Sequence, residues 1–406
     1  MRLSFTSKAV IALAFVAVLF SVVKFNHCYN TNWSGVGVDV HECYSDLPAL
    51  FDARNLVNHV WPYSSATNSV EYPPLTGVVM WATALITPHG YNADKYYYLI
   101  NIVFLALLFI GSALLVSKMN PQKWYLLPLL PAVIASMYIN WDLWAVFSAL
   151  LSIYLFDKKR YGTSAIALAI SIATKFFPIV LLIPIAVIFI KERKLHLAVR
   201  YILQTGSMWL AINLPFILTT PTGWWRFFKL NSTRPADLGS LWQALDIYNI
   251  KVSHLNLYWI SLFALGSIAV VGYLLRSAIT PTLAQIAFIF VALFTALNKV
   301  YSPQYVLWLA PLAVLALTNA RDRAAFWIWQ GAEAFYHFAI WEYLGGYAGA
   351  KFALPPRWYA GAIVIRVLTS LYFALRTLTS TQTPRLNPQP RSPHKRRNFS
   401  YLTPRA

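Results

Sequence analysis

The sequence predicts an all-α, polytopic integral membrane protein. Of its 406 residues, 58% are hydrophobic and only 12% are charged, whereas a soluble domain carries about 25% charged residues. The mean hydropathy is +0.52, and long apolar runs recur along most of the chain. At about 20 residues per spanning helix, these runs supply about 12 transmembrane helices. The composition therefore excludes an ordinary soluble protein.

The basic residues predict how these helices cross the membrane. The net charge is +19, from 33 Lys and Arg against 14 Asp and Glu, and basic residues mark the cytoplasmic loops of membrane proteins. They stand in clusters between the apolar runs, so we expect no nucleic-acid partner. With these clusters inside, both termini are cytoplasmic, and the spans fall at approximately 8–25, 96–117, 124–139, 142–156, 163–174, 177–190, 197–218, 257–275, 282–297, 303–318, 324–343 and 358–377.

The first span is expected to stay attached to the protein. The apolar run that follows Lys8 has no small-residue cleavage site before the next polar stretch. The chain's two cysteines, Cys28 and Cys43, come directly after this run, in one outer loop. A lone pair in an exported loop can form a disulfide, and two unpaired thiols are the alternative.

Two pairs of short helices are expected in the middle of the chain. The segments between the basic clusters there are too short for two full spans, and their interruptions fall at Asn140-Trp141-Asp142 and at Lys175-Phe176-Phe177-Pro178. Interrupted helices expose backbone polar groups, so they usually line a polar cavity. The charge map places this cavity on the outer side.

One membrane domain is expected over 1–378, with long outer loops at about 26–95 and 219–256. The first loop contains an apolar piece, Thr76 to Pro88, which is too short to cross and is predicted to re-enter or to lie at the interface. The second mixes Trp and Phe with basic residues, which suits the headgroup level. The tail, 379–406, is rich in Pro and Arg and is predicted to be disordered, cytoplasmic and attracted to anionic lipids.

Ionisable residues gather at the predicted outer boundary. The span at 324–343 also carries Glu333 and His337, four residues apart and so on one helix face. Because such groups are costly in lipid, they either line a functional path or satisfy each other and neighbouring helices. Lys175 either meets an anionic ligand or extends to the membrane surface. No phosphate loop, metal-spaced Cys/His cluster or Ser/His/Asp arrangement is present in the sequence, so we expect no metal or other cofactor.

Six short motifs follow one another in a particular order. They are Asp46-Leu-Pro-Ala-Leu-Phe-Asp-Ala-Arg54, Trp61-Pro62-Tyr63, Glu71-Tyr-Pro-Pro-Leu75, Asn140-Trp-Asp142, Lys175-Phe-Phe-Pro178 and Lys299-Val-Tyr-Ser-Pro-Gln-Tyr305. This order resembles glycosyltransferase family 87 over most of the chain up to about residue 320. That family belongs to the C-type superfamily of polytopic transferases, which use polyprenyl-phosphate sugars, typically mannose. Asn140-Trp141-Asp142 departs from the Gly-Gln-x-Asn-like pattern of many members, which leaves the role of Asp142 open.

The resemblance implies that Asp46 is the catalytic base, which deprotonates the acceptor hydroxyl as it attacks the anomeric carbon. The leaving phosphate is a stable anion, so it needs cations and no general acid. In-line attack on a β-linked donor gives an α-glycoside. The residues expected to bind the donor phosphate are Lys175, Arg234 and Lys299, and those expected to contact substrate are Arg54, Glu71, Tyr72, Gln304 and His337.

We therefore expect a glycosyltransferase at the outer face of a bacterial plasma membrane. Its partners would be a polyprenyl-phosphate sugar, a lipid-linked or cell-envelope glycan acceptor, and the membrane lipids. A transporter or lipid flippase that uses Glu333 and His337 as a proton relay is the main alternative, and a scaffold with a recruiting tail is another. The crowding of polar motifs at one boundary and the absence of two related halves favour the transferase.

Overall fold

The computed structural model describes residues 4–317 and 322–380, and these residues form helices and connections without a strand. Among them, five helices are long and apolar enough to cross a membrane. They are α1 (Phe5–Asn30), α5 (Ala93–Met119), α11 (Leu195–Thr219), α14 (Leu255–Arg276) and α18 (Pro356–Ser380). The prediction of an all-α protein with apolar helices long enough to cross a membrane is confirmed for the described residues.

Shorter or more polar helices occupy most of the other predicted spans. They are α8 (Asp142–Asp157), α9 (Tyr161–Thr174), η2 (Phe177–Leu181) with α10 (Leu182–Lys191), α15 (Leu283–Leu297), η3 (Pro303–Tyr305) with α16 (Val306–Ala316), and α17 (Arg323–Tyr347). The predicted helix break at Lys175 lies between α9 and η2 and is confirmed.

The prediction of one helix over 124–139 is wrong. The segment forms two short helices, α6 (Leu126–Leu129) and α7 (Pro131–Ser136). Leu130 between them is extended, with φ −77° and ψ 118°. A residue that precedes proline avoids the helical region, because the proline ring clashes with its backbone, so Pro131 ends one helix and begins the next.

The two long loops contain helices of their own. Between α1 and α5 lie α2 (Gly37–Val40), α3 (Asp46–Ala53), η1 (Leu56–Asn58) and α4 (Pro74–Leu85), and between α11 and α14 lie α12 (Pro221–Thr233) and α13 (Leu241–Ile247). The apolar piece at 76–88 is thus mostly α4, which packs against α5, α9 and α11. The predicted tail, 379–406, lies outside the described residues except for the end of α18.

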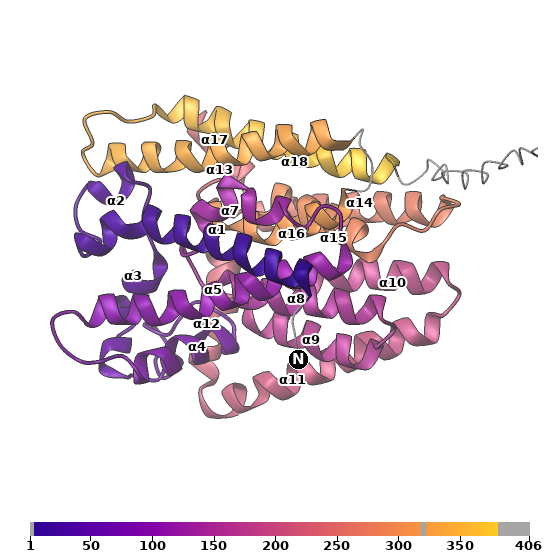
Figure 1. The fold of residues 1–406 in the computed structure, drawn as a ribbon, viewed down its shortest axis with the longest axis horizontal. Helices are drawn as coiled ribbons and strands as arrows, with labels where there is room; N and C mark the ends of the chain where they lie inside the picture. Colours follow the sequence, from indigo (N-terminus) through magenta and orange to yellow (C-terminus); the bar gives the residue numbers. More distant parts are fainter. Residues whose placement is uncertain (1–3, 318–321, 381–406) are drawn as a thin grey trace, which may run out of the picture.

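The connections between helices lie at the two ends of the helix bundle (Figure 1). In Figure 1, α2, α3, α4 and the α17–α18 connection lie toward the left, while the α10–α11 and α14–α15 connections and the end of α18 lie toward the right. At the right, α10 ends at Lys191 and is followed by Arg193 and Lys194, and α14 ends at Arg276, so basic residues gather at these connections. The long loops that carry the first motifs therefore lie at the end opposite these basic connections.

Small polar side chains let the central helices approach closely. The Ser171 hydroxyl on α9 donates to the Ala145 carbonyl on α8 at 2.7 Å, and Ser152 and Ser164 exchange hydrogen bonds across the same pair. The Tyr201 hydroxyl on α11 lies 2.8 Å from the Ser164 hydroxyl. Helices in lipid associate through such small-residue contacts, because burial of apolar side chains gains nothing there.

A disulfide joins Cys28, in the last turn of α1, to Cys43. Of the two sequence alternatives, the bonded one is confirmed. The first helix is longer than predicted, so Cys28 lies inside it rather than in the polar segment that follows. The bond therefore ties the end of α1 to the segment that leads directly into α3.

Replacing Cys28 by serine is expected to lower the free energy of unfolding by about 3 kcal/mol, because cross-links that close loops of about 15 residues restrict the unfolded chain by that amount. The two cysteines are 15 residues apart. Denaturant unfolding of the detergent-solubilised protein measures the change. Cys43→Ser removes the same bond and is expected to cause the same loss. Equal stability of wild type and both variants under non-reducing conditions would contradict the prediction.

Candidate functional site

Asp46 stands at the first position of α3, and the start of this helix is fixed to another part of the chain. The Ser45 hydroxyl accepts a hydrogen bond from the Leu47 amide at 3.2 Å and donates one to the Tyr138 carbonyl at 2.7 Å. The Asp46 amide donates to the Ile139 carbonyl at 2.7 Å. A serine in this position satisfies the free amides of a first helical turn, and an acid there suits the helix dipole.

Three neutral donors hold the Asp46 carboxylate. The Tyr44 hydroxyl donates to Oδ1 at 2.9 Å, and Asn140 Nδ2 and the Tyr72 hydroxyl donate to Oδ2 at 2.5 and 3.4 Å. Asn140 also donates to the Tyr72 hydroxyl at 2.8 Å. The long loop between α1 and α5 and the segment between α7 and α8 thus meet at this carboxylate.

Burial raises the pKa of the Asp46 carboxyl above the usual range for aspartate. The hydrogen bond from Tyr44, the charge of Lys175 and the hydrogen bond from Asn140 all favour the carboxylate, but they offset only part of this effect. A carboxylate with a raised pKa binds a proton more readily than an exposed one, which is the property of a general base.

Lys175 brings a positive charge to the same place. Its Nζ lies 3.4 Å from Asp142 Oδ2 and 4.3 Å from the centre of the Tyr72 ring. Asp142 is fully buried and accepts the Trp308 indole N–H at 2.6 Å. Asp142, whose role the sequence left open, is therefore the ion-pair partner of Lys175, and both lie within electrostatic reach of Asp46.

Arg54 and Glu71 bind each other. The guanidinium donates twice to the carboxylate, at 2.7 and 2.8 Å. Such a bidentate pair fixes geometry more firmly than a single contact. It joins the end of α3 to the residue before Tyr72, so it helps to place the Tyr72 hydroxyl at Asp46. The substrate-binding roles expected for these two residues stay predictions.

Arg234 and Lys299 form a second basic group. The buried Lys299 ammonium donates to the Arg234 carbonyl at 2.8 Å and to Asn256 Oδ1 at 2.7 Å. Burial and the neighbouring Arg234 lower the pKa of Lys299. Arg234 forms an ion pair with Asp237. Lys299 and Arg234 thus contact each other, whereas the described contacts of Lys175 are with Asp142 and Tyr72.

A stack of aromatic rings connects the last motif to Asp142. The Trp308 ring lies between Phe177 and Tyr305, at centroid distances of 3.8 and 3.6 Å. Gln304 is buried in η3, next to Tyr305. Because Trp308 donates to Asp142, the stack holds the motif at 299–305 beside the Lys175 ion pair.

His337 on α17 is buried among polar groups other than those that contact Glu333. Its ring nitrogens lie 3.4 Å from Lys24 Nζ, 3.4 Å from the Ser136 hydroxyl and 3.2 Å from the Trp341 indole nitrogen. The Trp341 ring lies 5.7 Å from that of Tyr44, the donor to Asp46. This polar group is therefore adjacent to the Asp46 site, although His337 has no described contact with Asp46 itself.

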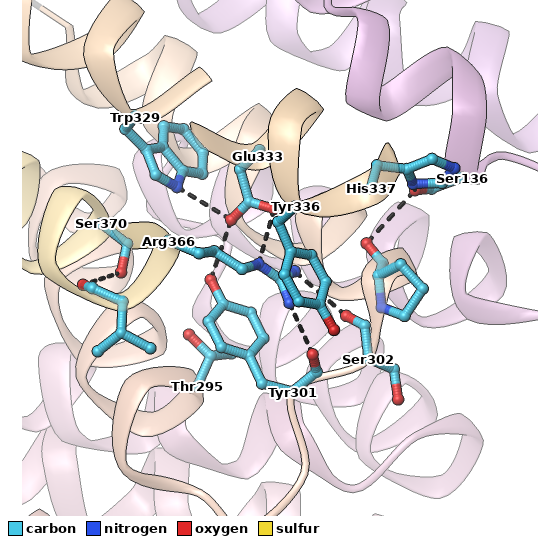
Figure 2. A network of polar contacts seen from close by, with 12 residues as sticks. Ser136, Thr295, Tyr301, Ser302, Trp329, Glu333, Tyr336, His337, Arg366 and Ser370 are labelled. Carbon is cyan, nitrogen blue, oxygen red and sulfur yellow. Dashed lines mark hydrogen bonds and ion pairs between the residues drawn. The ribbon is translucent and has the colours of Figure 1, made fainter. Parts of the chain in front are cut away.

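Glu333 is held by a different set of groups, which Figure 2 shows. Arg366 on α18 donates to its carboxylate at 2.9 Å, and the Tyr301 hydroxyl and Trp329 indole donate at 3.1 Å each. Arg366 also donates to the carbonyls of Tyr301 and Ser302, at 2.6 and 3.2 Å. Of the two sequence alternatives for Glu333, these contacts fit the interhelical one. Glu333 and His337 share a helix face but bind separate partners.

Helix α12 packs against this region. Phe176, the neighbour of Lys175, contacts the rings of Phe227 and Phe228 at 5.9 and 5.8 Å. Gly223 lies so close to the loop between α1 and α5 that an added Cβ would lie 1.9 Å from the Tyr63 carbonyl oxygen. Glycine is thus required where α12 meets the loop that positions Tyr72.

Sequence reasoning missed several of these residues as parts of a site. Tyr44 and Asn140 stood beside predicted residues, but nothing in the sequence assigned them to Asp46. Arg366 did carry a signal, because an arginine within a predicted span requires a buried partner. Among the described residues, no group of three or more His, Cys, Asp or Glu side chains comes together in a way that could hold a metal.

Comparisons with known proteins add no family assignment. No family model matches the chain, and no curated protein matches it. The similarity to glycosyltransferase family 87 therefore rests on the order of the six motifs. In the structure, residues of the first, third, fourth and fifth motifs meet around Asp46.

Proposed function

We propose that this protein is a C-type membrane glycosyltransferase, which transfers a sugar, with mannose as the first candidate, from a polyprenyl phosphate to a lipid-linked or cell-envelope glycan. The observation that carries the proposal is the Asp46 carboxylate, partly buried, bound by neutral donors and near the Lys175 ammonium. A base and a cation beside one another are what transfer from a sugar phosphate requires.

The reaction is a single displacement. The acceptor oxygen forms a bond to the anomeric carbon, its proton passes to Asp46, and the bond from carbon to phosphate oxygen breaks. The electron pair leaves on the phosphate, so the second carboxylate of a glycosidase is not needed. Attack from the opposite face inverts a β-linked donor to an α-glycoside.

Cations stabilise the charge that develops on the phosphate. Lys175 is the first candidate, because it lies closest in the contact network to Asp46. Lys299 and Arg234 are the second group. An ammonium has three donors and a guanidinium five, so Lys299, with two hydrogen bonds described, and Arg234, paired with one carboxylate, both keep donors for a phosphate.

The proposal includes a topology. About 12 crossings are an even number, so both termini lie on the same side of the membrane. The positive-inside rule places the basic connections, and with them the termini, in the cytoplasm of a bacterial cell. The loops that carry Asp46 then face outward. Polyprenyl-phosphate sugars and lipid-linked acceptors are amphiphiles, so an enzyme embedded in the same membrane can reach both.

A transporter or flippase is less well supported. It would need Glu333 to bind and release protons during each cycle, but the carboxylate is enclosed by Arg366, Tyr301 and Trp329. The scaffold alternative does not account for the donors gathered at Asp46.

The test is transfer of radiolabel from polyprenyl-phosphate mannose to endogenous lipids, in membranes with and without the protein. A labelled glycolipid that forms only with the protein supports the proposal. If no product forms with mannose or with other polyprenyl-phosphate sugars, the transferase function is wrong, and the transporter becomes the better explanation.

Replacing Tyr44 by phenylalanine is expected to move the acidic limb of the pH–rate profile to higher pH. The hydroxyl stabilises the Asp46 carboxylate and so lowers its pKa. Its loss raises that pKa, and a general base works only when deprotonated, so more of the enzyme is inactive at a given acidic pH. The pH dependence of sugar transfer measures the shift. A limb that stays in place, or moves to lower pH, would contradict the assignment.

A further inference from the structure

A polar cavity that does not include Asp46 lies between the α8–α9 turn and α11. It is a cavity of about 260 Å³, and its lining includes Lys159, Gly162, Arg200, Tyr201 and Gln204. Helices α9 and α11 pack side by side there (Figure 1). None of the groups proposed to act in sugar transfer lines this cavity.

The charge of the cavity is uncompensated. Lys159 and Arg200 are its charged residues, and no Asp or Glu lines it. In the described part of the chain neither cation takes part in an ion pair. Two cations that face one cavity without a carboxylate favour an anionic occupant.

The walls are held by hydrogen bonds and ring contacts. The Tyr201 hydroxyl lies 3.2 and 2.8 Å from the Ser152 and Ser164 hydroxyls. Gln204 donates to the Gly162 carbonyl at 3.3 Å. The Tyr161 ring contacts the Phe156 ring at a centroid distance of 5.1 Å. The polar wall is thus preorganised, which lowers the cost of binding.

The cavity adjoins an open, largely apolar face of α11. This face shares Arg200 and Gln204 with the cavity and also includes His196 and Ser207. Its apolar residues are Leu195, Val199 and Leu203, which are 62%, 50% and 64% exposed. A small basic cavity beside an apolar face of a membrane-spanning helix matches an amphiphile with an anionic head and acyl chains.

We propose that this cavity binds the phosphate headgroup of an anionic glycerophospholipid, with its chains along α11. The α8–α9 turn carries a basic cluster, Lys158-Lys159-Arg160, of the kind that faces the anionic cytoplasmic leaflet. Basic pockets between spanning helices on that side are suited to such headgroups. The inference does not depend on the transferase activity.

Native mass spectrometry of the full-length protein in detergent tests this, with phosphatidylglycerol or phosphatidylcholine added. The wild type is expected to retain phosphatidylglycerol preferentially. Removing both cations, in Lys159→Gly with Arg200→Gln, is expected to weaken its binding by about 30-fold, since each basic residue contributes roughly fivefold. Lys159 has a φ of 59°, so glycine there does not strain the turn.

The matched control is Arg193→Gly with Arg276→Gln. It removes the same charge, and Arg193 also has a positive φ, of 58°, but neither residue lines the cavity. Unchanged binding in the control supports a specific site, whereas an equal loss in both double variants would show general charge attraction and overturn the proposal. Glycerol phosphate that displaces the lipid at equal concentration would identify a soluble phosphate ligand and also overturn it.

Photo-cross-linking of wild-type protein provides a test that does not rely on variant folding. A photoactivatable phosphatidylglycerol in vesicles is expected to label the α11 segment at 195–207. Labelling confined to other helices would contradict the proposed site.

Discussion

Replacing Asp46 by asparagine is expected to lower the rate of sugar transfer by about 10²- to 10⁴-fold, the usual contribution of general-base catalysis. The amide keeps the size of the side chain and an oxygen that can accept from Tyr44 or Asn140, but it cannot take a proton from the acceptor. Binding of the donor is expected to change less than the rate. Initial rates of label transfer, at matched protein levels and varied donor concentration, separate these two effects.

Asp52 provides the control on the same short helix. It is exposed on α3, and Asp52→Asn makes the same chemical change outside the contact network of Asp46. This variant is expected to keep wild-type activity. If Asp46→Asn retained full activity, Asp46 would not be the base even if the protein proved to be a transferase. If both variants lost activity equally, a folding defect in α3 would be the better explanation.

Replacing Arg366 by methionine is expected to destabilise the protein by about 3–5 kcal/mol, because it leaves the Glu333 charge buried without its partner. Arg366 and Glu333 are 0% and 1% exposed as side chains. The loss is larger than that of one ion pair, since Arg366 also holds the backbone carbonyls of Tyr301 and Ser302. Denaturant unfolding in detergent, together with the yield of folded protein, measures the effect.

The same substitution elsewhere on α18 provides the comparison. Arg357, near the start of α18, is exposed and takes part in no ion pair within the described part of the chain. Surface substitutions away from packed or paired groups change stability by about 0.5 kcal/mol or less, so Arg357→Met is expected to be nearly neutral. Replacing both partners, in Glu333→Leu with Arg366→Met, should recover part of the stability, because no buried charge is then left unpaired. Similar losses for Arg366→Met and Arg357→Met would contradict the structural role of Arg366.

The sequence predicts the helices well where apolar residues run without interruption. The expected spans at 257–275 and 282–297 lie within two residues of α14 and α15 at each end. It fails at 124–139, where Pro131 divides an equally apolar segment. Hydropathy records how much a residue avoids water but not the backbone angles that proline imposes on its neighbour. Composition alone could not place that break.

The candidate site was predictable in its charges and not in its contacts. Asp46, Tyr72 and Lys175 were assigned separate roles in one reaction, and the structure brings them together. The pairing of Asp142 with Lys175 and of Glu333 with Arg366 could not be predicted, because the partners are 33 residues apart in both cases and lie on different helices. Such pairings follow from how helices pack, which a single sequence does not encode locally.

Formation of the disulfide between Cys28 and Cys43 can be used to follow insertion of the protein into the membrane. Disulfides form and persist in oxidising compartments and are rare in the cytosol. If the first loop is exported, newly made chains should change from reactive to unreactive toward thiol-alkylating reagents as that loop leaves the cytoplasm. Pulse-labelled cells would then show when, and on which side of the membrane, the segment before Asp46 matures, without any added tag.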